Sequence, residues 1–472
     1  MEERVVFAAG SGNENSKRKG EIMTTVNLDN AIRINLPPTE PNLRPARFET
    51  EDGRVGWVTS LPGSKPIATP AYDNGLLFVG GGYGSFDFYA FHASSGEMVW
   101  SLRTSDDGPT AAVVDDGLVA FSTESCSVIV CQAATGEVVW QEWLGDPLMS
   151  QPAIDKGKLF LAYPTGQTKG QPIMNRGHAM LCADLRTGEH VWEQEITADV
   201  MTAPVINDDQ VFFTCFDGTA FCLDAKNGKV EWRERTESTS APLVVDDEVV
   251  MSEKTQQADR SEESVWRRRR GSGERSHAEA MWSKRASFLD EETGGSSGLS
   301  HAYSKTLDSS VGFGTAPHAA KLQMAKKHVG VSTVAQAWAY QGSRASYGKG
   351  NYYQSGSGMV NCISKEYKKS WKTEFTGKEV KVDDQTFLPP SMGKDYLYLC
   401  SRHGHLVSVR QDNGTTGFCY STKEPMSFQP SLAQGALFAG TSYGKLFCLE
   451  TGDDDASDWH MWGGNAQHNK TR

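Results

Sequence analysis

The residues with the clearest capacity for chemistry are four consecutive arginines, Arg267 to Arg270, which directly follow Trp266. Guanidinium groups bind carboxylates and phosphates through paired hydrogen bonds, and an indole ring can stack on another planar group. We therefore treat Trp266, Arg267, Arg268, Arg269 and Arg270 as candidate partner-binding residues. The simpler interpretation, which we prefer, is a solvated loop without a binding role.

Two histidines flank a glycine at His403-Gly404-His405. On an extended strand this spacing would place both imidazoles on one face, which suits a metal ion. However, Gly404 corresponds to the turn glycines of other repeats, such as Gly218 and Gly444. We therefore expect the two histidines to diverge from a turn, and we predict no metal site.

Other catalytic arrangements are not encoded in recognisable form. The nine cysteines include no Cys-x-x-Cys pair, which excludes a zinc ribbon and a c-type haem site. Cys182, Cys222, Cys362 and Cys448 occupy equivalent places in a repeat, where a small apolar residue suits the core. No Gly-x-Ser-x-Gly elbow falls on the β pattern. The sequence thus assigns no catalytic residue and leaves any cofactor ligand unknown.

Composition restricts the class of protein. The chain has 472 residues, is 38% hydrophobic and carries a formal net charge of -12. This charge makes nucleic acid an unlikely general partner, although a local basic patch could still act alone. No run of about 18 apolar residues predicts a membrane span. Val5–Ala9 is too short for the apolar core of a secretory signal, so we expect a cytoplasmic protein or one that lacks an upstream export segment.

The elements that must position these residues are repeated hairpins. Phe221–Trp232 has a short apolar strand, the turn Asn227-Gly228 and a second strand that ends in tryptophan; a tight turn here would need positive φ at both central residues. The same sequence pattern recurs at Ala90–Trp100, Val130–Trp140 and Cys182–Trp192. One such hairpin cannot bury its own apolar face, so the copies must stack or form a ring. We predict that large aromatic rings pack between neighbouring copies at Trp57, Trp100, Trp140, Trp192, Trp232, Trp338 and Trp371.

A second marker counts the repeats. Acidic or glycine-bearing turns separate apolar strands at eight places, and all but one of the intervals between them are about 40 to 50 residues, as in a four-stranded propeller blade. These turns lie at 73–75, 115–117, 155–157, 207–209, 246–248, 348–350, 393–395 and 433–435. They predict an all-β, eight-bladed propeller of antiparallel four-stranded blades, with seven blades as the alternative. The doubled interval from Glu248 to Gly350 predicts a long insertion in blade 5, at residues 256–330.

The two ends of the chain complete this plan. Val55–Ser60 carries Trp57 but has no preceding hairpin, so it should pair with the last blade and close the ring. We therefore predict an N-terminal extension or linker at residues 1–53, the propeller at 54–452 and a C-terminal tail at 453–472. Trp459 and Trp462 in the tail could dock against the ring.

Cys222-Leu223-Asp224-Ala225-Lys226-Asn227-Gly228-Lys229-Val230-Glu231-Trp232 resembles the tryptophan-docking repeat of quinoprotein-like (PQQ-repeat) β-propellers. Matches weaken late in the chain, since Ile363–Trp371 lacks the turn glycine and Phe418 stands where tryptophan is usual. The resemblance implies two functional classes. Quinone-dependent dehydrogenases hold pyrroloquinoline quinone and calcium in the propeller channel, whereas BamB-type outer-membrane assembly proteins use the propeller as an interaction platform without a quinone.

From this resemblance we expect a non-catalytic scaffold that binds protein partners on its propeller faces or its insertion loop, with no cofactor. The resemblance also implies the periplasm or cell envelope. One alternative is a dehydrogenase that uses a channel-bound quinone and calcium. The other is a binder of nucleic acid or acidic partners that acts through Arg267 to Arg270. Fold alone does not separate these classes.

Overall fold

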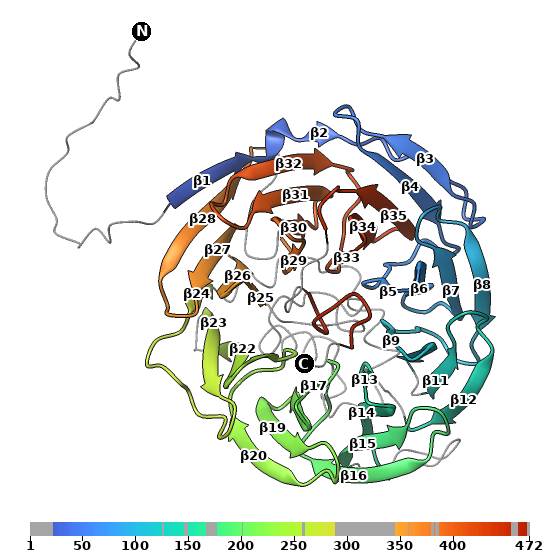
Figure 1. Cartoon of the computed structure of the whole chain (residues 1–472), viewed down its shortest axis with the longest axis vertical. Coiled ribbons are helices and arrows are strands. Elements are labelled where there is room, and N and C mark those ends of the chain that lie inside the picture. The colour runs from blue at the N-terminus through green and yellow to red at the C-terminus, as the bar shows by residue number, and fades with distance from the viewer. Residues whose placement is uncertain are drawn as a thin grey trace, which may run out of the picture.

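The computed structural model describes residues 22–124, 127–145, 150–166, 177–200, 202–256, 260–287, 345–356, 358–378, 382, 387–454 and 461–469. Within them, eight β-sheets are arranged as a ring (Figure 1). The first strand of each blade is innermost and contacts its counterpart in the next blade, from β5 (Ala71–Asp73) round to β33 (Ser431–Ala433) and back to β5. The protein is therefore an all-β, eight-bladed propeller, as the eight turns predict, and the seven-bladed alternative is wrong.

Blades 1 to 4 each have four antiparallel strands, ordered from the centre outward. Blade 1 contains β5, β6 (Leu76–Gly80), β7 (Asp87–His92) and β8 (Met98–Arg103). Blade 2 contains β9 (Val113–Asp115), β10 (Leu118–Ser122), β11 (Ser127–Gln132) and β12 (Val138–Trp143). Blade 3 contains β13 (Ala153–Asp155), β14 (Lys158–Pro164), β15 (His178–Asp184) and β16 (His190–Ile196). Blade 4 contains β17 (Val205–Asn207), β18 (Gln210–Thr214), β19 (Thr219–Asp224) and β20 (Val230–Arg235).

The later blades follow the same plan. Blade 5 contains β21 (Leu243–Val245), β22 (Glu248–Gln256), β23 (Arg260–Arg269) and β24 (Trp282–Ser287). Blade 6 contains β25 (Ala345–Gly348), β26 (Asn351–Gly356), β27 (Met359–Ser364) and β28 (Lys369–Thr376). Blade 7 contains β29 (Ser391–Met392), β30 (Tyr396–Cys400), β31 (His405–Arg410) and β32 (Thr416–Ser421). Blade 8 contains β33, β34 (Ala436–Gly440), β35 (Lys445–Glu450) and β4 (Val55–Ser60).

The ring closes as predicted, because β4 pairs antiparallel with β35 and places Trp57 opposite Cys448. The residues before β4 also form strands, which the prediction of a linker did not include. β3 (Ala46–Glu49) adds to β4, while β1 (Ile22–Asn27) and β2 (Ile32–Arg33) pair in parallel with β28 and β32; the 3-10 helix η1 (Leu28–Asn30) joins them. Blades 6, 7 and 8 therefore have five strands, and Figure 1 shows this blue segment along their outer rim. The added strands cover edges that would otherwise expose unpaired backbone groups.

The prediction of a two-residue turn at Asn227-Gly228 is wrong. Only Gly228 of the pair has positive φ, at 72°, and the Gly228 N–H donates to the Asp224 carbonyl at 2.8 Å. The Asp224 carboxylate accepts from the N–H groups of Lys226 and Asn227 at 2.8 and 3.1 Å, which stabilises a longer loop. Two-residue turns occur instead between the first two strands of a blade, as at Asn74 (φ 46°) and Gly75 (φ 82°).

Each docking tryptophan extends from an outer strand into the hairpin of the next blade. The Trp192 indole N–H donates to the Ala225 carbonyl at 2.9 Å, and a Cβ atom on Gly228 would lie 2.5 Å from Trp192 Cε3. Glycine is therefore required for both its positive φ and its missing side chain. The same arrangement is made by Trp57, Trp100, Trp140, Trp232 and Trp371. Trp338 lies outside the described residues.

The predicted start of the insertion at Gln256 needs correction. β23 and β24 pair with each other and with β22, so residues 260–287 belong to blade 5. β24 is the outermost strand of blade 5. The repeat is hard to recognise here because long, polar strands replace the usual short apolar ones. The insertion therefore follows β24, and most of the predicted range lies outside the described residues.

Both faces of a blade are buried against its neighbours. Between blades 1 and 2, for example, Phe88 stacks on Phe121 with ring centroids 4.0 Å apart. Seven free cysteines are buried and Cys419 is partly exposed, consistent with their expected role as small core residues. In the described part of the chain, no helix has the length and hydropathy needed to cross a bilayer.

Candidate functional site

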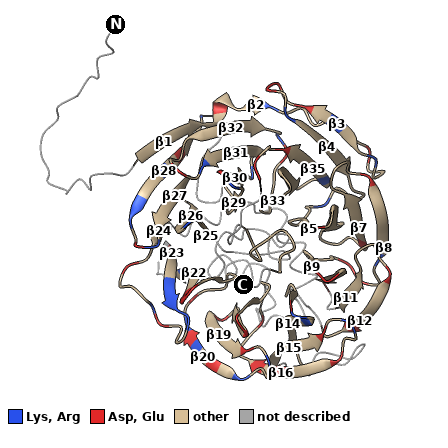
Figure 2. Ribbon diagram, viewed as in Figure 1, with Lys and Arg blue, Asp and Glu red and all other residues tan. Residues whose placement is uncertain are grey.

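The predicted arginine segment is part of a blade, not a solvated loop. Trp266 and Arg267 to Arg269 are the last four residues of β23, and Arg270 begins the hairpin that follows (Figure 2). The side chain of Arg269 is 61% exposed and pairs with Glu274 at 3.0 Å. Arg267 and Arg268 are buried. Most of the run therefore contacts its own protein.

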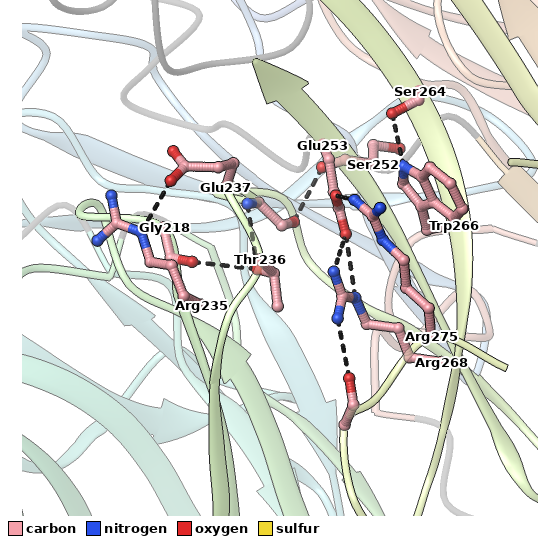
Figure 3. Close-up of polar contacts among 12 residues, drawn as sticks. Gly218, Arg235, Thr236, Glu237, Ser252, Glu253, Ser264, Trp266, Arg268 and Arg275 are labelled. Carbon is pink, nitrogen blue, oxygen red and sulfur yellow. Dashed lines mark hydrogen bonds and ion pairs between the residues drawn. The ribbon is translucent and has the colours of Figure 1, made fainter. Parts of the chain in front are cut away.

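The centre of this site is a buried carboxylate between two arginines (Figure 3). Glu253 is 1% exposed; its Oε1 accepts from Arg268 Nε at 3.0 Å, and its Oε2 accepts from Arg275 Nη2 at 3.0 Å. Burial raises the pKa of Glu253, and the two guanidinium groups oppose that rise. A buried charge of this kind needs paired, hydrogen-bonded partners, which the arginines supply.

Trp266 and Arg275 form the accessible edge of this cluster. The Arg275 guanidinium lies over the Trp266 ring, 3.6 Å from its centroid, and the Trp266 indole donates to Ser264 Oγ at 2.8 Å. The side chain of Arg275 is 48% exposed. Sequence reasoning identified Trp266 but missed Arg275 and Glu253, because nothing in a polar stretch marks which charges are buried together.

Arg267 takes the place of a docking tryptophan. Its guanidinium donates to the Lys365 carbonyl in the hairpin of blade 6 and to Glu248. It also lies over the ring of Tyr367, 4.3 Å from the centroid. His277 stacks on the same ring with centroids 3.9 Å apart. The side chain therefore joins blades 5 and 6.

Arg270 joins blades 4 and 5. It donates to Gln210 Oε1 at 2.7 Å and to the Asn207 carbonyl at 2.9 Å, and it pairs with Asp208 at 2.9 Å. Its own carbonyl accepts the Trp232 indole N–H at 2.7 Å. The surface that this segment leaves for a partner is limited to Arg269, Arg275 and the edge of Trp266.

The two predicted histidines flank a turn, as expected. Gly404 has a φ of 81°, and β31 begins at His405. His405 is buried, which lowers its pKa, and its Nδ1 lies 3.3 Å from Ser401 Oγ. Among the described residues, no group of three or more His, Cys, Asp or Glu side chains is placed to hold a metal ion.

The central channel is occupied by the chain itself. Residues 461–469 cross the axis of the ring (Figure 1), and the N–H groups of Tyr72 and Val114 donate to the carbonyls of Ala466 and Gln467 at 2.8 and 3.0 Å. Trp462 is buried against small residues that precede the innermost strands: Ala68, Ala111, Ala203 and Ala241. The docking of Trp462 agrees with the expectation for the tail.

A profile of the family described as outer membrane protein assembly factor BamB matches residues 46–279. The BamB of Nitrosomonas eutropha is 24% identical over 235 residues, covering 40% of this chain and 56% of that protein. The crystal structure of BamB from Moraxella catarrhalis superposes with a TM-score of 0.54 at 13% identity, covering 86% of this chain and all of that one. The chain is a distant member of the BamB-like PQQ-repeat propellers.

This BamB-like chain spans about half the length of the curated relatives it matches, including the 54% covered in the Burkholderia pseudomallei protein at 24% identity. The fold is also shared with enzymes. The quinohemoprotein alcohol dehydrogenase of Comamonas testosteroni superposes with a TM-score of 0.54 at 12% identity, covering 90% of this chain and 79% of that one. At such identity the likeness shows the fold alone.

The quinoprotein resemblance implies a quinone and calcium in the channel, and the residues present there do not fit this pair. The axis is filled by the Trp462 indole and by His468, whose rings meet edge to face with centroids 3.9 Å apart. One cavity that the described residues form beside Trp462 and His468 has a volume of about 20 Å³, which suits a water molecule and not a tricyclic quinone. We therefore derive no chemical step through a quinone.

Proposed function

We propose that this BamB-like propeller is a non-catalytic scaffold that binds other proteins, and that it acts in assembly at the cell envelope. The observation that carries this proposal is the filled channel. With the axis occupied by residues 461–469, the described part of the chain offers a protein partner its rim and the two ends of the ring. The relatives named as outer-membrane assembly factors support the same reading, although only about half of their length is matched.

The rim of blades 1 to 3 is the best candidate for the partner surface. Here the outer strands β8, β12 and β16 expose apolar side chains near their first residues, each between 36% and 47% accessible: Met98, Val99, Val138, Val139 and Val191. In blades 6 to 8 the equivalent edges are covered by β1, β2 and β3. Exposed apolar side chains that recur on neighbouring strands are typical of protein-binding surfaces.

A crosslinking experiment in the native host tests this proposal. A photoreactive amino acid at Val99, Val139 or Val191 should give an adduct with one defined protein of the envelope fraction. The same group at Glu234, on the outer strand of blade 4, is the matched control. Replacing the three valines with lysine should abolish the adduct and lower the amount of assembled outer-membrane protein. Equal adducts at all four positions, or a normal envelope in the triple variant, would contradict the proposal.

The dehydrogenase alternative is tested separately. Calorimetric titration with pyrroloquinoline quinone and calcium, followed by dye reduction with simple alcohols, should give no heat of binding and no turnover. Tight binding with dye reduction would overturn the scaffold proposal, because it would require Trp462 to leave the channel.

A further inference from the structure

The C-terminal segment, residues 461–469, contacts the channel through backbone as well as side chains. Its carbonyls at Ala466 and Gln467 accept from the innermost strands of blades 1 and 2. Asn469 Nδ2 donates to the Val114 carbonyl, and His468 Nδ1 lies 2.7 Å from the Ala112 carbonyl. The Trp462 N–H donates to Gln429 Oε1 at 3.1 Å, next to blade 8. These hydrogen bonds therefore involve both the backbone of the segment and particular side chains in it.

The conformation of the segment also depends on its sequence. Gly463 and Gly464 have positive φ values of 69° and 85°, so the chain turns back directly after Trp462. A Cβ atom on Gly463 would lie 2.5 Å from His468 Cα, which excludes any other residue there. The turn brings His468 against the Trp462 ring. The segment is therefore a compact unit with an aromatic anchor.

The channel offers a matching receptor. The alanines around Trp462 come from blades 1, 2, 4 and 5, and their small side chains leave room for one indole at the axis. An aromatic anchor in a pocket, with backbone hydrogen bonds on either side, is a common mode of peptide recognition. The Trp462 Nε1 atom is buried and has no hydrogen-bond partner among the described residues. A buried donor without a partner costs free energy, so Trp462 binds in the channel more weakly than it would if its indole N–H were hydrogen-bonded.

We propose that the channel is a sequence-selective peptide-binding site, and that residues 461–469 are its ligand, held in cis. The site recognises the spacing Trp462-Gly463-Gly464 followed by His468-Asn469. It differs from a permanent structural strap in one respect: the same segment, supplied as a separate peptide, competes for the site. This inference does not rest on the proposed partner surface, since the rim of blades 1 to 3 takes no part in it.

The test uses the full chain and a fluorescein-labelled synthetic peptide of residues 458–470. In the double variant Trp462→Ala, Asn469→Ala the attached segment loses its anchor and one hydrogen bond, so the free peptide should bind with one-to-one stoichiometry by fluorescence anisotropy. The unaltered protein should bind the peptide at least tenfold more weakly, because its own segment competes at a high effective concentration. A control peptide that carries Trp462→Ala should not bind either protein.

Folding of each variant is checked by a cooperative thermal transition. If the double variant does not fold, Asn469→Ala alone is titrated, and its affinity for the peptide should exceed that of the unaltered protein. A folded variant that fails to bind the peptide at several hundred micromolar, or binds the control peptide equally well, would overturn the proposal. That result would leave residues 461–469 as a strap, and it would not affect the crosslinking expected at Val99, Val139 and Val191.

Discussion

Arg54, directly before β4, donates a hydrogen bond from Nη1 to the carbonyl oxygen of Thr451, directly after β35, at 2.7 Å; the bond lies within blade 8, at its junction with blade 7. At six other junctions the equivalent carbonyl accepts an indole N–H. The blade 7 hairpin has Phe418 in place of tryptophan, and the Arg54 guanidinium lies over its ring, 5.2 Å from the centroid. Between blades 5 and 6, where an indole donor is also missing, Arg267 donates to the Lys365 carbonyl. An arginine above an aromatic ring thus replaces the indole at both junctions that lack it.

Replacing Arg54 with methionine should lower the free energy of unfolding by about 1–3 kcal/mol, because the buried Thr451 carbonyl loses its charged donor. Differential scanning calorimetry measures this change as a lower Tm. The matched control is Arg47→Met, on an exposed position of β3, which should change stability by no more than about 0.5 kcal/mol. Equal effects of the two substitutions would show that Arg54 is not a docking residue.

The docking glycines can be separated from ordinary turn glycines by one pair of variants. Gly228 and Gly117 have nearly the same φ, 72° and 73°, but a Cβ atom on Gly228 would lie 2.5 Å from Trp192, whereas Gly117 has nothing within 4 Å. Gly117→Ala reports the backbone strain alone, about 1–2 kcal/mol. Gly228→Ala should cost clearly more, with a change in the fluorescence of the partly buried Trp192. Similar Tm values for both variants would contradict the docking geometry.

Much of this fold could be predicted because the repeat is marked by turn residues and tryptophans, whose effects on the structure are local. The turns and the tryptophans recur at fixed spacing, and the isolated strand with Trp57 required a partner at the far end of the chain. The pairing of β4 with β35 follows from counting alone. The hairpin turn was misjudged because Asn227-Gly228 also suits a two-residue turn, and only the Asp224 carboxylate favours the longer loop.

The rest depended on contacts that sequence spacing does not encode. β2 has only two residues and β1 buries only Val26, so their pairing with β28 and β32 gave no signal. Arg267 and Arg268 were expected to be solvent-exposed because charged residues usually are. Their partners Glu248 and Glu253 lie 15 to 19 residues away in sequence, so the spacing does not reveal the pairs. The channel contacts of Trp462 and His468 join residues more than 30 positions apart in sequence.

The arginine segment should separate into structural and exposed members by mutation. Arg268→Met removes one of two cations from the buried Glu253 carboxylate and should cost about 3–5 kcal/mol. Arg269→Met, at the neighbouring exposed position, should leave the Tm nearly unchanged, because a surface ion pair contributes about 0–1 kcal/mol. For this reason a partner role of the segment is tested with Arg269 and not with all four arginines. Equal destabilisation by both variants would refute the burial of Arg268.

The ion pair of Asp184 with Lys158 should give a measurable pH dependence. The Lys158 ammonium, 2.9 Å away, lowers the pKa of Asp184 from 3.8 to about 2. A depressed carboxylate pKa stabilises the folded state above the unfolded pKa, and this contribution is lost as the pH falls through the folded value. The Tm of the wild type minus that of Asp184→Asn should therefore be largest above pH 4 and shrink toward pH 2. A difference that grows on acidification would contradict the pairing.

Blade 6 carries a buried amide pair at a position that is hydrophobic in the seven other blades. The fourth residue of the second strand is Gln354 there, opposite Asn361; elsewhere it is Val79, Phe121, Leu161, Phe213, Met251, Leu399 or Ala439. Gln354 is 1% and Asn361 4% exposed. Within the part of the chain that the structure describes, Gln354 Nε2 and Oε1 and Asn361 Nδ2 have no hydrogen-bond partner.

Such groups destabilise a fold by about 1–3 kcal/mol each, so Gln354→Met with Asn361→Leu should raise the free energy of unfolding. Chemical denaturation followed by tryptophan fluorescence measures the change. The reverse substitution in blade 7, Leu399→Gln, is the control and should lower stability. If the double variant of blade 6 is instead less stable than the wild type, the amides must be hydrogen-bonded to water or a ligand between blades 5 and 6. A high-resolution crystal structure of the wild type would then locate that partner.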